Sequence, residues 1–151
     1  MTQIDREIAN IANQHPTAKR LQQLRGIGPL IATALVATIG DGKQYRKGRE
    51  MAAALGLTPR QQSSGGKDRL LGISKRGDAY LRCLLVHGAR SAIRTLPGKD
   101  DRLARWVTNL QKRRHTNVVA VAMANKLARV AWIIMAKDEE FDPGKCLAVA
   151  R

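Results

Sequence analysis

One long apolar segment, from Thr116 to Ala136, constrains the fold of this chain more than any other stretch. Its sequence, TNVVAVAMANKLARVAWIIMA, contains neither glycine nor proline and predicts a single long helix that is mostly buried. Three polar residues interrupt it: Asn125, Lys126 and Arg129. Charges on a buried helix are costly unless they are paired or face a site. These residues therefore either face a binding site or form the one exposed edge of the helix, and both alternatives stay open.

The remaining periodic segments also predict helices. Apolar spacings of three and four place them at residues 4–14, 17–25, 30–40, 49–56, 75–94 and 100–114. Asp100 and Asp101 favour the start of the last of these, because carboxylates are stabilised at a helix N-terminus. Residues 58–73 predict a loop, and no segment alternates convincingly enough to predict a strand. The expected fold class is all-α, a helical domain with a helix-hairpin-helix and a glycine-rich basic loop between helices.

The charge of the chain is strongly positive and uneven. There are 27 Lys and Arg residues against 12 Asp and Glu, giving a net charge of +15. Residues 60–114 hold 14 basic and 4 acidic residues, so this third of the chain contributes +10 (14 minus 4). A charge of this size indicates an anionic partner, for which nucleic acid is the leading candidate and a membrane surface the weaker one.

Other features exclude several classes. No uninterrupted apolar run approaches the roughly 18 residues that span a bilayer, and the N-terminus lacks the apolar core of a signal peptide. Cys83 and Cys146 are unrelated in context, which indicates reduced thiols rather than a disulfide framework. The three histidines show no metal-ligand spacing, and the acidic residues are scattered. We therefore expect no metal site in this chain, and a cytoplasmic location.

The segment LQQLRGIGPLIATALV fits a helix-hairpin-helix, in which a short Gly-x-Gly turn joins two helices. Gly26 and Gly28 would leave backbone N–H groups exposed at a helix N-terminus, where a phosphate can bind. The alternative is a plain helical hairpin with a glycine turn. If it binds phosphate, the motif positions a nucleic acid and performs no reaction.

The segment QQSSGGKDRLLGISKRG contains the residues most suited to take part in a reaction. Gly65 and Gly66 permit close backbone approach, and the serines at 63 and 64 supply hydroxyls. The spacing is not that of a P-loop. One interpretation is a flexible basic loop that lies on a phosphate backbone. The other is a nucleophilic serine, activated by neighbouring cations, that attacks a phosphodiester.

Further along the chain, Arg82, Arg90 and Arg94 share one face of a predicted helix. They form either a basic stripe or an ordinary solvated face. The residues predicted to bind DNA are Gly26, Gly28, Arg60, Gly65, Gly66, Lys67, Arg69, Lys75, Arg76, Arg82, Arg90, Lys126 and Arg129.

Three segments together resemble a known family. LRGIGPLIATALVATIGD, MAAALGLTPRQQSSGGKDRLLGISKRGDAYLRCLLVHGARS and NVVAVAMANKLARVAWIIM are similar to the C-terminal domain of DEDD-type insertion-sequence transposases. These are relatives of the pilin-gene invertase, and some are bridge-RNA-guided recombinases. The most specific element is P-R-x-x-x-S-G followed by G-x-[IM]-[ST]-K-x-G. The resemblance covers residues 21–141, with residues 1–20 as an inter-domain helical segment and 142–151 as a tail.

The resemblance implies a catalytic serine that forms a covalent link to DNA during strand cleavage and exchange. In the family pattern this serine directly precedes the glycine, which assigns the role to Ser64, whereas Ser63 occupies a variable position. Lys75 corresponds to the lysine of the I-S-K segment, and its contact with a phosphate is our inference. The alternative is a non-catalytic helix-hairpin-helix module that binds nucleic acid.

The family also carries an N-terminal RuvC-like domain with four acidic residues and Mg²⁺. That domain has no counterpart in this sequence, so we expect no cofactor in the chain itself and no activity without the acidic domain. Expected partners are DNA, a guide RNA in the guided branch of the family, and further copies of the full-length protein in a dimer or tetramer. Within a bacterium, the protein would be associated with the nucleoid.

Overall fold

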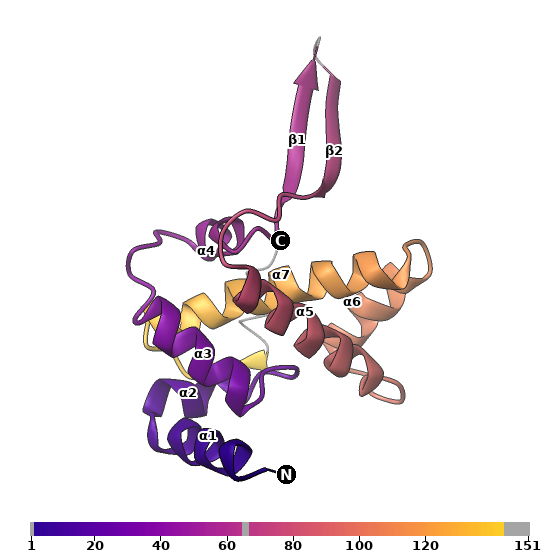
Figure 1. Ribbon diagram of the computed structural model, residues 1–151. Helices are drawn as coiled ribbons and strands as arrows, with labels where there is room; N and C mark the ends of the chain where they lie inside the picture. The colour runs from indigo at the N-terminus through magenta and orange to yellow at the C-terminus, as the bar shows by residue number, and fades with distance from the viewer. Residues whose placement is uncertain (1, 65–66, 144–151) are drawn as a thin grey trace.

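The computed structural model describes residues 2–64 and 67–143, and between residues 61 and 70 it describes the backbone alone. The elements in chain order are α1 (Gln3–Gln14), α2 (Pro16–Leu21), α3 (Pro29–Ile39), α4 (Gly48–Ala54), β1 (Pro59–Ser64), β2 (Lys67–Ile73), α5 (Ala79–Arg94), α6 (Arg102–Gln111) and α7 (Thr116–Ala136). Most of the described chain is helical, so the predicted all-α class is confirmed (Figure 1).

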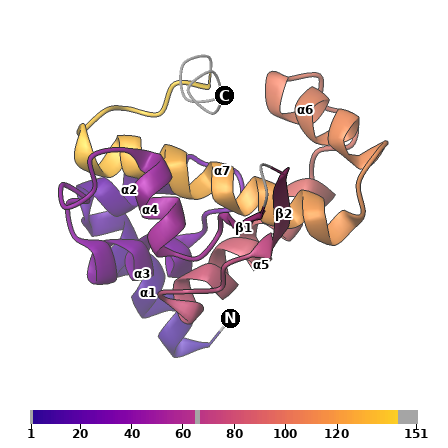
Figure 2. The same ribbon diagram turned by 90° about the horizontal axis from the view of Figure 1, so that it is seen from above.

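Helix α7 is the central element, as its sequence predicts. It packs against α2, α4, α5 and α6, and Met123, Ala128 and Ile134 are among its buried residues. Helices α1 to α3 gather at one end of α7 and α6 lies at the other (Figure 2). The core is almost entirely aliphatic, since alanine, leucine, isoleucine, valine and methionine supply all of its fully buried residues.

Helix α7 corrects the expectation that no apolar segment of the chain is long enough to span a membrane. Within the described residues it is the one helix long and apolar enough to cross a membrane, by length and composition alone. However, 61% of its most apolar window is buried inside the fold. That pattern is typical of a core helix, whose apolar surface is covered by neighbouring helices.

The glycine-rich segment differs from the predicted loop, because it forms an antiparallel β-hairpin. Gln61 pairs with Leu70 and Ser64 with Lys67, and a register shift lies between Pro59 and Gln61. The hairpin projects away from the helical body (Figure 1). The stretch QQSS gives no apolar alternation that would indicate a strand, and the two strands are joined by the hydrogen-bond ladder of their backbones.

Several helix boundaries also differ from the sequence-based prediction. Helix α5 begins at Ala79 rather than near residue 75, with the Asp78 side chain accepting from the Leu81 amide at 2.8 Å. Lys75 and Gly77 have positive φ angles of 56° and 80°, which no helix can include. Helix α2 ends at Leu21, four residues earlier than expected.

The starts of α6 and α1 show what capping and packing contribute. The Asp101 side chain caps α6 by accepting from the Ala104 amide at 2.8 Å, as the sequence indicates for this aspartate pair. That amide and Arg25 lower the pKa of Asp101.

Helix α1 is amphipathic as predicted, but its apolar face is largely uncovered, with Ile4 and Ile11 exposed and Ala12 buried.

Candidate nucleic-acid interface

A cleft of about 870 Å³ opens where the hairpin joins the helical body. We call it the hairpin-base cleft. One wall is the base of the hairpin, from Pro59 and from residues 71–73, and the opposite wall is the N-terminal half of α7 together with Trp106 of α6. The described residues that line it are Leu57, Pro59, Arg60, Leu71, Gly72, Ile73, Lys75, Trp106, Arg114, Asn117, Val118, Val121, Ala122, Asn125, Lys126 and Arg129.

The charge of this cleft has one sign. Its described lining includes five cationic side chains and no carboxylate. Four of the five were predicted from the sequence to bind DNA: Arg60, Lys75, Lys126 and Arg129. They come from positions as much as 69 residues apart in sequence and meet because the base of the hairpin lies beside α7. A cleft lined by charges of one sign concentrates ions of the opposite sign, so this one attracts anions.

Lys126 is the most deeply placed of these cations. Only 9% of the residue is exposed, and its Nζ lies 4.7 Å from the centroid of the Trp106 ring, a cation–π contact. Burial lowers the pKa of Lys126, and the nearby charges of Arg129 and Arg102 lower it further. An ammonium held in this way gains from a phosphate, which would offset both the desolvation and the repulsion.

The polar residues Asn125, Lys126 and Arg129 of α7 all line this cleft, and their part in binding stays a prediction. Asn125 donates from Nδ2 to the Leu57 carbonyl at 3.1 Å and so ties α7 to the segment before β1. Arg129 is half-buried, and burial followed by the charge of Arg49 lowers its pKa. The three residues therefore line a cleft rather than an exposed helix edge.

The backbone around Lys75 fixes the base of the hairpin. The amide of Ser74 donates to the Thr58 carbonyl at 2.8 Å, and the amide of Lys75 donates to the Gly56 carbonyl at 3.2 Å. Lys75 itself adopts a left-handed conformation, with φ at 56°. These bonds extend the hairpin connection beyond the last paired strand residues and hold Lys75 at the edge of the cleft.

Other predicted DNA-binding residues lie outside the cleft and have structural partners. Arg82 donates from Nη1 to the Leu55 carbonyl at 3.1 Å and to the Arg76 carbonyl at 3.2 Å, so it joins α5 to the end of α4. Arg90 is exposed and donates to Asn117 Oδ1 at 3.3 Å. The structure thus gives Arg82 a role in the fold, and contact of either arginine with DNA remains a prediction.

The two glycines of the predicted helix-hairpin-helix differ from one another. Gly26 has φ at 95°, and a Cβ there would lie 2.5 Å from the Gly88 carbonyl oxygen on α5. Its first role is therefore close packing between the turn and α5. Gly28 is exposed, caps α3 in an extended conformation and has no neighbouring atom within 4 Å of a Cβ position.

The predicted nucleophile ends a strand. Ser64 is the last residue of β1 and pairs with Lys67, the first residue of β2. Arg60 lines the cleft from the same strand, so the chain rises about 13 Å between them at 3.3 Å per residue. The predicted contacts Gly65 and Gly66 lie outside the described residues, and Lys67 and Arg69 are described by their backbone alone.

Three polar or aromatic residues of the cleft were not predicted from the sequence: Trp106, Arg114 and Asn117. All three lie in or after α6, where the sequence shows only an amphipathic helix followed by basic residues. A tryptophan next to Arg105, six residues before the basic run 112–114, was the one available signal, and it is common at ordinary helix surfaces.

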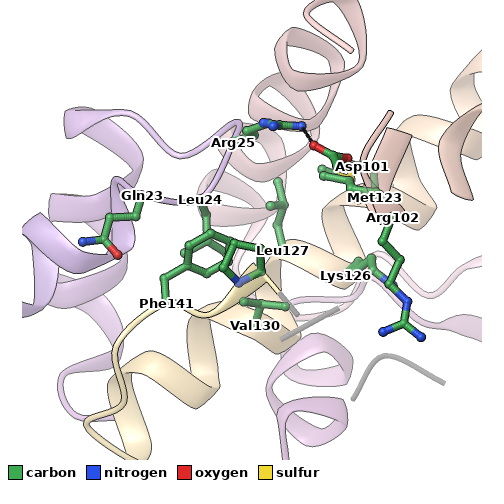
Figure 3. A pocket seen from close by; sticks show the side chains of 12 residues that line it. Gln23, Leu24, Arg25, Asp101, Arg102, Met123, Lys126, Leu127, Val130 and Phe141 are labelled. Atoms are coloured by element: carbon green, nitrogen blue, oxygen red, sulfur yellow. Dashed lines mark ion pairs between the residues drawn. The ribbon is translucent and has the colours of Figure 1, made fainter. Parts of the chain in front are cut away.

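A second, smaller cavity of about 350 Å³ lies on the other side of Lys126 (Figure 3). Leu24, Leu127, Val130 and Phe141 make it mainly apolar. Arg25 forms an ion pair with Asp101 at its rim. Phe141 points into it beside Leu24 and Val130, so the segment after α7 already fills part of this space (Figure 3). Neither cavity offers a metal site, because no three His, Cys, Asp or Glu side chains group together among the described residues.

Fold and cleft together define a class: a basic helical domain with a projecting β-hairpin and an anion-attracting cleft at its base. Residues 18–104 match the model of the transposase IS116/IS110/IS902 family. The chain belongs to this family, which confirms that it is part of a transposase, as the resemblance in the sequence indicates.

Relatives extend the similarity along nearly the whole chain. A probable family 20 transposase of Pseudomonas aeruginosa is 46% identical over 95% of this chain and 43% of its own length. The transposase for insertion sequence element IS1328 of Yersinia enterocolitica is 48% identical over 92% of this chain and 42% of its own length. The transposase for IS1111A of Coxiella burnetii is 40% identical over 93% of this chain and 38% of its own length. The chain therefore spans less than half the length of these relatives.

Proposed function

We propose that this chain is the DNA-binding, nucleophile-bearing part of an insertion-sequence transposase, and that Ser64 is the nucleophile. The observation that supports this most directly is the hairpin. It carries Ser64 at the far end of a strand that projects from the body, while the base of the same strand lines a cleft of five cations. Such an arrangement suits a DNA backbone that is held at the base and reacts at the tip.

The proposed reaction is a transesterification. The Ser64 Oγ loses its proton to a base and forms a bond to a backbone phosphorus, while the bond from that phosphorus to one deoxyribose oxygen breaks. The leaving oxygen takes up a proton and becomes a free hydroxyl. Since one phosphodiester replaces another, the reverse attack by a new strand end can rejoin the DNA. Nearby cations would stabilise the charge that develops on the phosphate.

In this proposal the metal ion is bound by another domain of the full-length protein and not by this chain. No metal-binding group of side chains occurs among the described residues. The Mg²⁺ expected of the family would be held by carboxylates of the acidic RuvC-like domain, and the chain alone would bind DNA without cleaving it. Assembly as a homo-oligomer, association with the bacterial nucleoid and use of a guide RNA remain predictions for the full-length protein.

The test uses two neighbouring serines as matched variants. Ser64→Ala should keep DNA binding but abolish strand exchange when the acidic domain is supplied, whereas Ser63→Ala should keep both. Strand exchange is measured on a plasmid substrate, and binding by fluorescence anisotropy. Normal exchange by Ser64→Ala would contradict the proposal. Loss of exchange in Ser63→Ala alone would move the nucleophile by one residue.

A non-catalytic role in nucleic-acid binding is the second candidate. The observation in its favour is that the cations of the described cleft lie at the base of the hairpin rather than at its tip. This candidate predicts the same salt-dependent binding, but it predicts normal exchange in both serine variants. The same pair of variants therefore separates the two candidates.

A further inference from the structure

The lining of the hairpin-base cleft combines apolar and cationic side chains, whereas contact with the phosphates of duplex DNA requires only the cations. Leu57, Leu71, Ile73, Val118 and Val121 form apolar walls between the five cations. A duplex presents its phosphates on the outside and keeps its bases stacked within. Apolar walls inside a basic cleft instead suit a ligand that carries a negative charge and a flat apolar surface together. The volume of about 870 Å³ falls in the range of ordinary ligand sites.

Trp106 supplies the second observation. It is half-buried, packs on the core and still lines the cleft, so its indole is held in place rather than free at the surface. Lys126 lies over one face of its ring, so a base would stack on the opposite face. Aromatic side chains in a positively charged groove are the common device for binding unpaired nucleotides, because every base can stack on them.

Amide side chains complete the lining. Asn117 and Asn125 both contribute to the cleft, and each is oriented by a hydrogen bond to another part of the chain, with Arg90 and with Leu57. Carboxamides pair with the hydrogen-bonding edges of bases, which are accessible only when a base is unpaired or lies in a groove.

We infer that the hairpin-base cleft binds an unpaired nucleotide, with its base against Trp106 and its flanking phosphates on Arg60, Arg114 and Arg129. The inference deepens the proposed function, on whose DNA binding it rests, by naming the form of nucleic acid that this cleft takes. Opened DNA strands present such nucleotides during strand exchange, and single-stranded RNA presents the same chemistry.

The test compares one oligonucleotide sequence as single-stranded DNA, single-stranded RNA and duplex DNA, each labelled with fluorescein. Trp106→Ala should weaken binding of single strands by about tenfold, the typical loss for one stacked base, and change duplex binding less than twofold. Trp106→Phe keeps a ring and should retain most of the affinity. Arg105→Ala, an exposed neighbour on α6, is the matched control and should affect all three ligands alike.

Emission of the native side chain gives a readout that does not depend on the alanine variant folding. In a Trp132→Phe protein, Trp106 is the only tryptophan. Single strands should quench its emission, and the duplex should quench it far less. Tighter binding of DNA or of RNA identifies which of the two supplies the strand.

Two results would overturn the inference: equal losses on single-stranded and duplex ligands in Trp106→Ala, or no quenching of Trp106 by single strands. Neither result touches the nucleophile, because these variants retain Ser64. Conversely, a failure of the serine prediction leaves the cleft measurements unchanged, so the two proposals fail separately.

Discussion

Gly26 and Gly28 stand two residues apart in one turn, yet they differ in what a side chain would meet. The substitution Gly26→Ser places a Cβ 2.5 Å from the Gly88 carbonyl oxygen, at a φ of 95°. We expect a loss of about 2–4 kcal/mol in the free energy of unfolding, from backbone strain and steric overlap together. Urea unfolding followed by circular dichroism measures it.

The same substitution at position 28 is the matched control. Gly28 caps α3 in an extended conformation, with no atom near a Cβ position. Serine is among the preferred residues at a helix N-cap, so Gly28→Ser should be neutral or stabilise by about a few tenths of a kcal/mol. Equal losses at both positions would contradict the packing role assigned to Gly26.

Because the pKa of Lys126 is lowered in the folded protein, we expect the free energy of unfolding to depend on pH. The unfolded lysine titrates near its ordinary pKa of 10.5, and burial lowers that pKa in the folded protein. Between the two pKa values the unfolded chain binds more protons, so stability rises with pH and the cost of the buried charge is lost by pH 10.5. Any stability advantage of Lys126→Met over the wild type should therefore shrink as pH rises from neutral toward that value.

Urea unfolding of both proteins across this pH range checks the prediction. Lys112→Met, at an exposed lysine just after α6, controls for the loss of one positive charge. A stability difference between wild type and Lys126→Met that stays constant with pH would contradict a buried, desolvated ammonium.

At the scale of elements, the hairpin and the cleft at its base are the features that the sequence predicted least well. The residues of the hairpin were singled out by composition, but they were expected to form a loop. Apolar alternation is the main signal for a strand, and QQSS has none. The cleft could be predicted only in part. Charge indicated Arg60 and Lys75, whereas nothing local showed that Trp106 would face them.

Removal of two cleft cations tests whether the cleft contacts phosphate. Lys75→Asn keeps a residue that tolerates the positive φ of this position, and Arg114→Gln removes an exposed charge. If each cation neutralises one phosphate, the double variant should lower the slope of log K against log salt by about 0.7 per cation on single strands. Anisotropy titrations at several salt concentrations measure this slope.

Lys43→Gln provides the control for general loss of charge. Lys43 follows Gly42, whose neighbours are Trp132 and Met135 at the opposite end of α7. The single control variant should leave the slope nearly unchanged. An equal decrease per cation in both proteins would show that binding depends on net charge and not on the cleft.

At the scale of the whole molecule, the sequence predicted the architecture well because one helix organises it. The expected and observed bounds of the last helix coincide at Thr116–Ala136. Its apolar length requires surrounding helices, and the remaining periodic segments supply them. Boundaries such as the start of α5 could not be predicted, since Gly77 adopts its φ of 80° where a Cβ would lie 1.7 Å from the Ala54 carbonyl oxygen. That contact is made by residues 23 positions apart.

The net charge of +15 also acts at this scale. Its concentration between residues 60 and 114 places much of it on the hairpin, α5 and α6. Of these elements, the hairpin and α6 contribute residues to the lining of the hairpin-base cleft. The molecule thus has an aliphatic body organised around α7, and its excess charge is carried largely by the elements that follow α4.

A covalent bond between Ser64 and DNA would be the most direct evidence for the proposed function. A nicked suicide substrate, incubated with this chain and the acidic domain in Mg²⁺, should trap a protein–DNA adduct that survives denaturant. Trypsin cleaves after Arg60 and Lys67, which yields a peptide of residues 61–67 containing both serines. We predict that fragmentation by mass spectrometry places the phosphodiester on Ser64. An adduct on any other residue, or none while strand exchange proceeds, would contradict the assignment of Ser64 as the nucleophile.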